Sequence, residues 1–163
     1  LAEGLAYDRC QVGVVTGLDP ADRHPDFYIE EPEHVFNVMR TQVDVVLPSG
    51  TAVLNAADEQ VVEMAELCDG KVIFYGMDSG LPAIAEHQQE GERVVFLRDG
   101  DIVLAQGSQD VAKLPLSSLK PSKASKPEMV MAAVAAAWAL DIPIELIAAG
   151  LRTFESNPKK TPY

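Results

Sequence analysis

Short, continuously apolar runs alternate with amphipathic stretches along the first half of the chain. Three of the runs are rich in β-branched residues, as strands buried on both faces of a parallel sheet are: residues 11–16, 51–54 and 71–75. Apolar positions at helical spacing predict three helices: residues 31–42, 59–67 and 82–89. Pro32 suits the first turn of the first helix, and Asp58 is placed to cap the second. The order strand, helix, strand, helix, strand predicts α/β layering with parallel strands.

A short connection precedes the second strand of this series. Residues 43–47 form a further short apolar element, and Pro48, Ser49 and Gly50 predict a turn after it.

The pattern changes in the second half. Residues 93–97 and 101–105 are two apolar runs joined by Asp99-Gly100, which predicts a tight hairpin, and residues 111–116 add a third strand. A polar Ser/Lys/Pro linker then leads to an Ala-rich helix at about residues 127–140 and an amphipathic helix at residues 144–154. The predicted fold class is therefore α/β: a partial parallel sheet flanked by helices, with a small antiparallel meander inserted before a long Ala-rich helix.

Composition narrows the class of protein. The 163 residues are 47% hydrophobic and 23% charged, which suits one globular domain. No apolar run reaches the roughly 18 residues of a membrane span, so no membrane partner is expected. The net charge of -12 and the lack of a broad basic patch argue against a nucleic-acid partner. Cys10 and Cys68 have no metal-site spacing, and they predict small buried residues of a reducing, cytoplasmic protein.

Candidate chemistry is confined to polar residues that follow predicted strands. No glycine-rich phosphate loop and no nucleophile elbow occur in the sequence. The loop after the first strand carries Asp19, Asp22, His24 and Asp26, which could hold Mg²⁺ or orient a phosphate, although Asp and Pro also simply favour loops.

Three further polar residues stand at the starts of predicted helices. Asn55 and Asp58 occupy the next strand-to-helix junction, as ligand contacts or as turn and cap residues. Glu128 opens the Ala-rich helix, where an acid also favours the helix dipole.

Three blocks of sequence resemble one known family. Residues 4–16 (GLAYDRCQVGVVT), 40–75 and 132–154 are similar, in order, to the central domain of the Mur ligase superfamily, and within it to the cyanophycin synthetase family. The resemblance implies that residues 1–154 are the second half of a nucleotide-binding domain, and residues 155–163 a linker to a C-terminal domain. It also implies ATP and Mg²⁺ as cofactors, and a cytoplasmic, homo-oligomeric protein.

The resemblance further implies a reaction. In such a ligase ATP activates the aspartate β-carboxylate of a peptide polymer as an acyl phosphate, and the small-molecule substrate arginine attacks it to form an amide. Asp22, Asn55, Asp58 and Glu128 are the implied nucleotide-binding residues, and His24 is the implied metal ligand. Because the phosphate loop is not among these residues, the isolated chain is expected to be inactive.

Four positions depart from the family pattern. Gly17 stands where an Asn is usual, Arg23 where a His is usual, Met39 where a Lys is usual, and Met129 where an adenine-contacting Asn is usual. Each change removes or alters a polar group near ATP or metal. The alternative is therefore a catalytically degenerate Mur-ligase-like domain with a structural or oligomerisation role.

Overall fold

The computed structural model of the chain describes residues 3–19, 21, 23–118 and 126–154. The predicted nucleotide-binding residue Asp22, most of the predicted Ser/Lys/Pro linker and the predicted tail at residues 155–163 lie outside the described residues.

A single mixed sheet of six strands organises the described part of the chain, and its strands lie side by side in chain order. The strands are β1 (Cys10–Val15), β2 (Val46–Asn55), β3 (Lys71–Gly76), β4 (Arg93–Arg98), β5 (Asp101–Gln106) and β6 (Gln109–Pro115). Neighbouring strands from β1 to β4 are parallel, whereas β4, β5 and β6 are antiparallel. This arrangement confirms the predicted parallel sheet with an appended meander.

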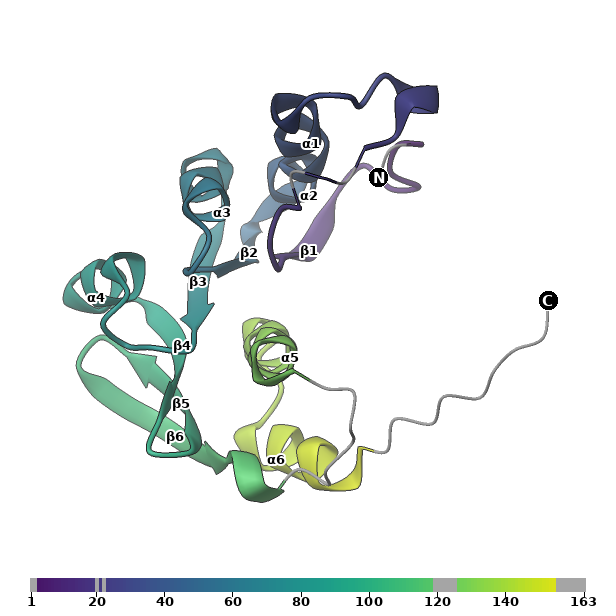
Figure 1. Ribbon diagram of the computed structural model, residues 1–163. Coiled ribbons are helices and arrows are strands. Elements are labelled where there is room, and N and C mark those ends of the chain that lie inside the picture. The colour runs from purple at the N-terminus through teal and green to yellow at the C-terminus, as the bar shows by residue number, and fades with distance from the viewer. Residues whose placement is uncertain (1–2, 20, 22, 119–125, 155–163) are drawn as a thin grey trace.

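Helices cover both faces of the sheet (Figure 1). One face carries α1 (Pro32–Met39), α2 (Thr41–Asp44), α3 (Glu59–Glu63), the 3-10 turn η2 (Met64–Leu67) and α4 (Pro82–Gln89). The other carries α5 (Pro127–Ala139) and α6 (Ile144–Thr153). Two more 3-10 turns are η1 (Pro25–Phe27) and η3 (Leu116–Ser118).

Successive strand residues point to opposite faces, which builds a separate core on each side. On β2, Leu54 packs under the first group of helices and Val53 packs under α5. The Ala-rich helix α5 lies directly on the sheet because small side chains such as Ala132 and Ala135 allow close approach, and Trp138 fills the space at its far end.

The hairpin prediction is confirmed in detail. Asp99 and Gly100 both adopt positive φ, at 54° and 85°. Two consecutive positive-φ residues form the primed turn whose twist matches that of the flanking strands. This tight connection fixes the register of β4 against β5, in which Arg93 lies opposite Gln106.

Several local predictions differ from the structure. Cys10 and Cys68, predicted to be buried, are only partly buried. The predicted helix at residues 59–67 is α-helical only to Glu63 and ends in the 3-10 turn η2. The predicted helix at residues 31–42 is divided into α1 and α2 at Arg40. The predicted turn at Pro48, Ser49 and Gly50 is wrong, because β2 runs through these residues.

An irregularity in β2 explains the wrong turn. Between Cys10 and Val12 the pairing advances two residues along β1 but five along β2, from Val46 to Thr51. The extra residues therefore form an irregular stretch within the strand rather than a reversal of chain direction. No helix in the described residues is both long and apolar enough to cross a membrane.

Candidate functional site

The ends of β1 and β2 are joined by Asn55 at the carboxyl edge of the sheet. Its Nδ2 donates a hydrogen bond to the carbonyl oxygen of Thr16 (2.9 Å), and its Oδ1 accepts one from the backbone N–H of Ala57 (3.0 Å). Both polar atoms of the side-chain amide are therefore hydrogen-bonded to the main chain of two neighbouring loops. In parallel α/β sheets this edge is where ligands bind.

Asp58 makes a second link between the same two loops. Its Oδ1 accepts hydrogen bonds from the backbone N–H groups of Gln60 (3.1 Å) and Val61 (3.4 Å), which caps α3 as predicted. Its Oδ2 accepts from the N–H of Leu18 (2.9 Å), in the loop that follows β1. The structure thus brings Asn55 and Asp58 together, and each holds the loops in place through main-chain partners.

The loop after β1 carries the remaining acidic candidates. Asp19 is exposed and its Oδ1 accepts from the N–H of Ala21 (2.9 Å), a local turn contact. His24 forms an isolated backbone bridge with Ile29, and Asp26 is exposed in η1. Among the described residues, no group of three His, Cys, Asp or Glu side chains could hold a metal ion. The predicted metal ligand His24 therefore stays a prediction, since Asp22 is not among the residues described.

Glu128 reaches the same edge from the opposite face. α5 runs antiparallel to the parallel strands, because Trp138 and Asp141 at its end accept hydrogen bonds from Arg93 at the beginning of β4. Glu128, in the first turn of α5, therefore lies near the strands' carboxyl ends and is half-buried. Its nucleotide-binding role stays a prediction.

Tyr75, at the end of β3, is a polar residue of this region that the sequence did not single out. It is fully buried, and its hydroxyl has no hydrogen-bond partner among the described residues. Burial, together with the nearby negative charge of Glu128, raises the pKa of Tyr75 to about 12. In the apolar run KVIFY the sequence does not separate Tyr75 from an ordinary buried aromatic residue, and its hydroxyl is the only signal that could have marked it.

The four departures from the family pattern have different surroundings. Met39 is partly buried and packs against the core under α1 to α4. Arg23 is exposed, and a Cβ on Gly17 would lie 3.6 Å from Asp58 Oδ2. Met129 is 51% exposed in the first turn of α5, so an apolar thioether and the Glu128 carboxylate begin this helix together.

The fold is that of part of a Mur ligase domain. A UDP-N-acetylmuramoylalanyl-D-glutamyl-2,6-diaminopimelate–D-alanyl-D-alanyl ligase from Acinetobacter baumannii superposes with a TM-score of 0.58 at 18% identity, covering 90% of this chain and 29% of that one. A pseudomurein peptide ligase type C from Methanothermus fervidus gives a TM-score of 0.59 at 18% identity, with coverage of 91% and 35%. At these identities the likeness establishes the fold alone.

Sequence comparison gives a nearer relation, to cyanophycin synthetases. The Synechocystis sp. protein is 32% identical over 169 residues, and the Geminocystis herdmanii protein is 31% identical over 171 residues. Each match includes 99% of this chain but only 19% of the relative's length. No protein-family model matches the chain. The chain is thus homologous to a segment of cyanophycin synthetase and forms a partial Mur-ligase-like domain.

Proposed function

We propose that the chain forms part of an ATP-dependent carbon–nitrogen ligase of the cyanophycin synthetase type. In the proposed reaction, the aspartate β-carboxylate of a peptide polymer attacks the γ-phosphate of ATP, which gives an acyl phosphate and ADP. The amine of arginine then attacks the acyl carbon, and an amide and phosphate are formed. The observation that carries the proposal is homology to cyanophycin synthetases along 99% of the chain.

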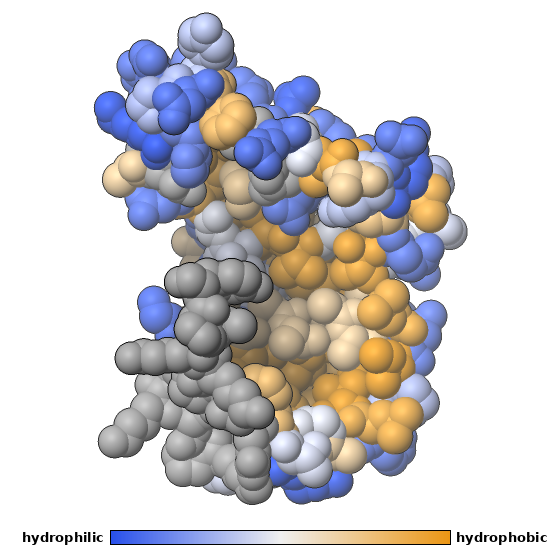
Figure 2. All heavy atoms as spheres, turned by 90° about the vertical axis from the view of Figure 1, so that its right-hand side faces the viewer, coloured by the Kyte–Doolittle hydropathy of each residue, from blue (hydrophilic) through white to orange (hydrophobic). Residues whose placement is uncertain are grey.

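The proposed domain organisation follows the same relation. Residues 1–154 would be the second half of the central nucleotide-binding domain, and residues 155–163 the linker to a C-terminal domain. An apolar hollow between α5 and the part of the molecule that carries β1 supports this organisation (Figure 1 and Figure 2). Val12 and Val14 on β1 are only half-buried on the α5 side of the sheet, which leaves room for a further covering element.

In this proposal Asn55 and Asp58 are positioning residues. Both carry polar groups at the edge where the nucleotide would bind, yet both are bound to backbone atoms. Their contribution would be to hold the loops after β1 and β2 in a fixed arrangement, because phosphoryl transfer depends mainly on positioning and charge stabilisation.

The start of α5 would contact the nucleotide base. Met129 is exposed there and can pack against an apolar ring face, but its thioether offers no amide for hydrogen bonding to adenine. Adenine selectivity would then be weaker than the family pattern implies.

Magnesium would neutralise phosphate charge during transfer in such a ligase. The described residues alone do not form a site for it, as no group of three potential ligands occurs among them. If His24 contributes, the described residues do not complete a set of three such ligands around it, and no step is assigned to the metal.

The competing proposal is a degenerate domain with a structural or oligomerisation role. Met39, which packs against the core, and the exposed Met129 favour it, because both positions lack the polar group of the family pattern. The two proposals differ in nucleotide binding. In a cytoplasmic protein that contains this segment with its flanking domains, the ligase proposal predicts Mg-ATP binding in the millimolar range or tighter.

ADP release tests the ligase proposal directly. A protein that contains this segment should release ADP only when ATP, arginine and an aspartate-containing primer are all present. Release that ignores arginine, or no release with any primer, would favour the degenerate alternative. The isolated chain should show no ATP hydrolysis, and turnover by the pure chain would contradict this assignment of roles.

A further inference from the structure

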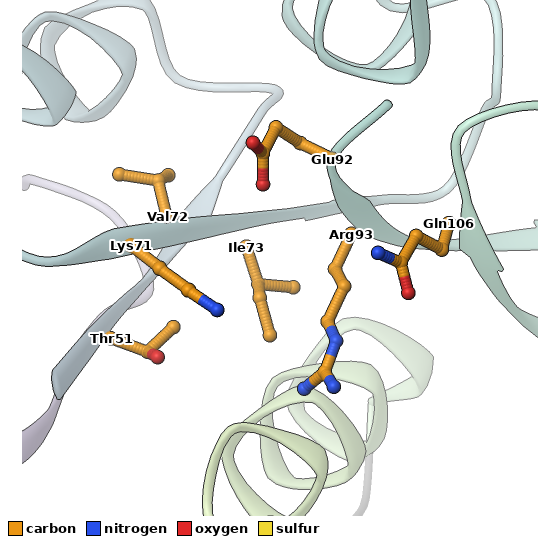
Figure 3. Close-up of a pocket in the computed structure, with 7 residues that line it drawn as sticks. All are labelled: Thr51, Lys71, Val72, Ile73, Glu92, Arg93 and Gln106. Carbon is orange, nitrogen blue, oxygen red and sulfur yellow. The ribbon is translucent and has the colours of Figure 1, made fainter. Parts of the chain in front are cut away.

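A small pocket lies at the amino-terminal edge of the parallel strands, on the α5 side of the sheet and away from the loops described above (Figure 3). Its volume is about 70 Å³. A buried water needs only about 10–15 Å³ on this measure, so the pocket has room for a small polyatomic ion.

Strand register explains why polar side chains gather there. Thr51 on β2 pairs with Lys71 on β3, and Arg93 on β4 pairs with Gln106 on β5. All four side chains share the face of the sheet that carries α5, and Figure 3 shows Lys71 and Arg93 on the same side of the strands as Ile73. Four hydrogen-bonding groups that are distant in sequence therefore line one pocket.

Three of these groups have no hydrogen-bond or ion-pair partner within the described part of the chain. Thr51 is 7% exposed as a residue, and its hydroxyl forms no hydrogen bond among the described residues. Among the described residues, Lys71 forms no salt bridge and the side-chain amide of Gln106 forms no hydrogen bond. Hydrogen-bonding groups that line a pocket without protein partners are available to bind water or a ligand.

Arg93 is held in place by other contacts. Its guanidinium lies 4.7 Å from the ring centroid of Trp138, and Nη1 donates to the Trp138 carbonyl and to Asp141 Oδ1, each at 3.3 Å. These contacts use Nη1 alone, so the N–H groups on Nε and Nη2 remain for a ligand. A cation already oriented in this way loses little freedom on binding an anion.

Most polar side chains that line the pocket are hydrogen-bond donors. An ammonium, a guanidinium, a hydroxyl and an amide all offer hydrogens to one volume. The carboxylate of Glu92 also belongs to the lining, but Figure 3 shows it on the opposite side of the strands from Lys71 and Arg93, and it is exposed. Asp141 offsets one positive charge, which leaves the ammonium of Lys71 uncompensated.

We propose that this pocket binds a small oxyanion, either a phosphate or the carboxylate of a small molecule, through Lys71, Arg93 and the hydroxyl of Thr51. Charge-assisted hydrogen bonds to the anion would give these donors the partners that they lack in the described part of the chain. The proposal does not depend on the ligase assignment, because the pocket and the candidate nucleotide site lie at opposite edges of the sheet.

Amide NMR of the ¹⁵N-labelled chain tests the site with two probe ions, inorganic phosphate and acetate, each titrated at constant ionic strength against potassium chloride. Saturable shifts at the amides of Thr51, Lys71 and Arg93 are expected with at least one ion. Saturation by acetate assigns a carboxylate ligand, and saturation by phosphate alone assigns a phosphate. Shifts that stay linear with concentration, or that match the chloride control, would overturn the proposal.

Variants locate the ion. Lys71→Met should weaken binding about tenfold or more, because it removes a charged hydrogen bond. Thr51→Val keeps the side-chain shape but removes the hydroxyl, and it should weaken binding severalfold. This variant tests the site independently if the Lys71→Met chain fails to fold. Lys113→Met is the matched control, since Lys113 pairs with Asp110 on β6, and it should leave the affinity unchanged. Equal affinity in Lys71→Met and the wild-type chain would place the ion elsewhere and refute the proposal.

Discussion

Asp58 offers a direct test of how the loops at the carboxyl edge are held. One carboxylate oxygen caps α3 and the other accepts the N–H of Leu18, so the side chain joins two segments 40 residues apart. Replacing it with alanine removes both contacts. Replacing it with asparagine keeps one oxygen for the cap but turns an N–H₂ group toward the N–H of Leu18.

The expected losses follow from these contacts. The lost helix cap costs about 1 kcal/mol, and the hydrogen bond between the carboxylate and Leu18 adds about 1.5 kcal/mol. Asp58→Ala should therefore lower the free energy of unfolding by about 2–3 kcal/mol. Asp58→Asn should lose roughly the second contribution only, because asparagine is as good a cap as aspartate.

Urea unfolding followed by circular dichroism measures the difference. With a slope of about 2 kcal/mol per molar urea, Asp58→Ala should shift the midpoint by about 1 M or more. Asp78→Ala is the control, because that exposed carboxylate accepts only from the nearby N–H of Gly80 (2.8 Å), and its loss should stay near 0.5 kcal/mol. An Asp58→Ala chain as stable as Asp78→Ala would refute the positioning role.

Three further predictions concern the core and the open face. Gly13→Ala should lower the free energy of unfolding by about 2 kcal/mol or more, because the added methyl would collide with the carbonyl oxygen of Gln42; Gly150→Ala, where the methyl meets open space, should be neutral or stabilising in the same urea assay. Tyr75→Phe should raise the free energy of unfolding by about 1 kcal/mol, because it removes a buried hydroxyl without a partner. In the wild-type chain Tyr75 ionises near pH 10 when the chain is unfolded, whereas in the folded chain it holds its proton to about pH 12. The free energy of unfolding should therefore fall by about 2–3 kcal/mol as the pH rises from 10 to 12. An equally steep loss in the Tyr75→Phe chain would contradict this cause. The apolar hollow in Figure 2 should lead the isolated chain to self-associate, and light scattering that gives the monomer mass of 17.6 kDa at every concentration would exclude this.

Much of the fold could be predicted because local signals agreed with the tertiary arrangement. The apolar runs at β1 and β3 are parallel strands, although one face of β1 is only half-buried, and the turn at Asp99 and Gly100 has the positive φ angles that its sequence favours. The turn predicted at residues 48–50 was wrong because the partner strand β1 imposes an irregular pairing that local sequence does not encode. Tertiary context there outweighs the turn preference of Pro and Gly.

Less of the candidate sites than of the fold could be predicted from the sequence. Asp58 was predicted as a cap because a cap depends on a few adjacent residues, and the structure confirms it. Its bond to Leu18 required knowledge of which loops meet. The pocket at Thr51 and Arg93 could not be foreseen either, since it depends on the register of four strands.

The most direct measurement of the proposed ligase chemistry follows an oxygen atom. A protein that contains this segment with its flanking domains would be given ATP, arginine and a primer with ¹⁸O in the aspartate β-carboxylate. Formation of an acyl phosphate transfers one carboxylate oxygen to phosphorus, so mass spectrometry should find one ¹⁸O in each released phosphate, and release should require arginine. Released phosphate without ¹⁸O, or no release at all, would contradict the ligase account.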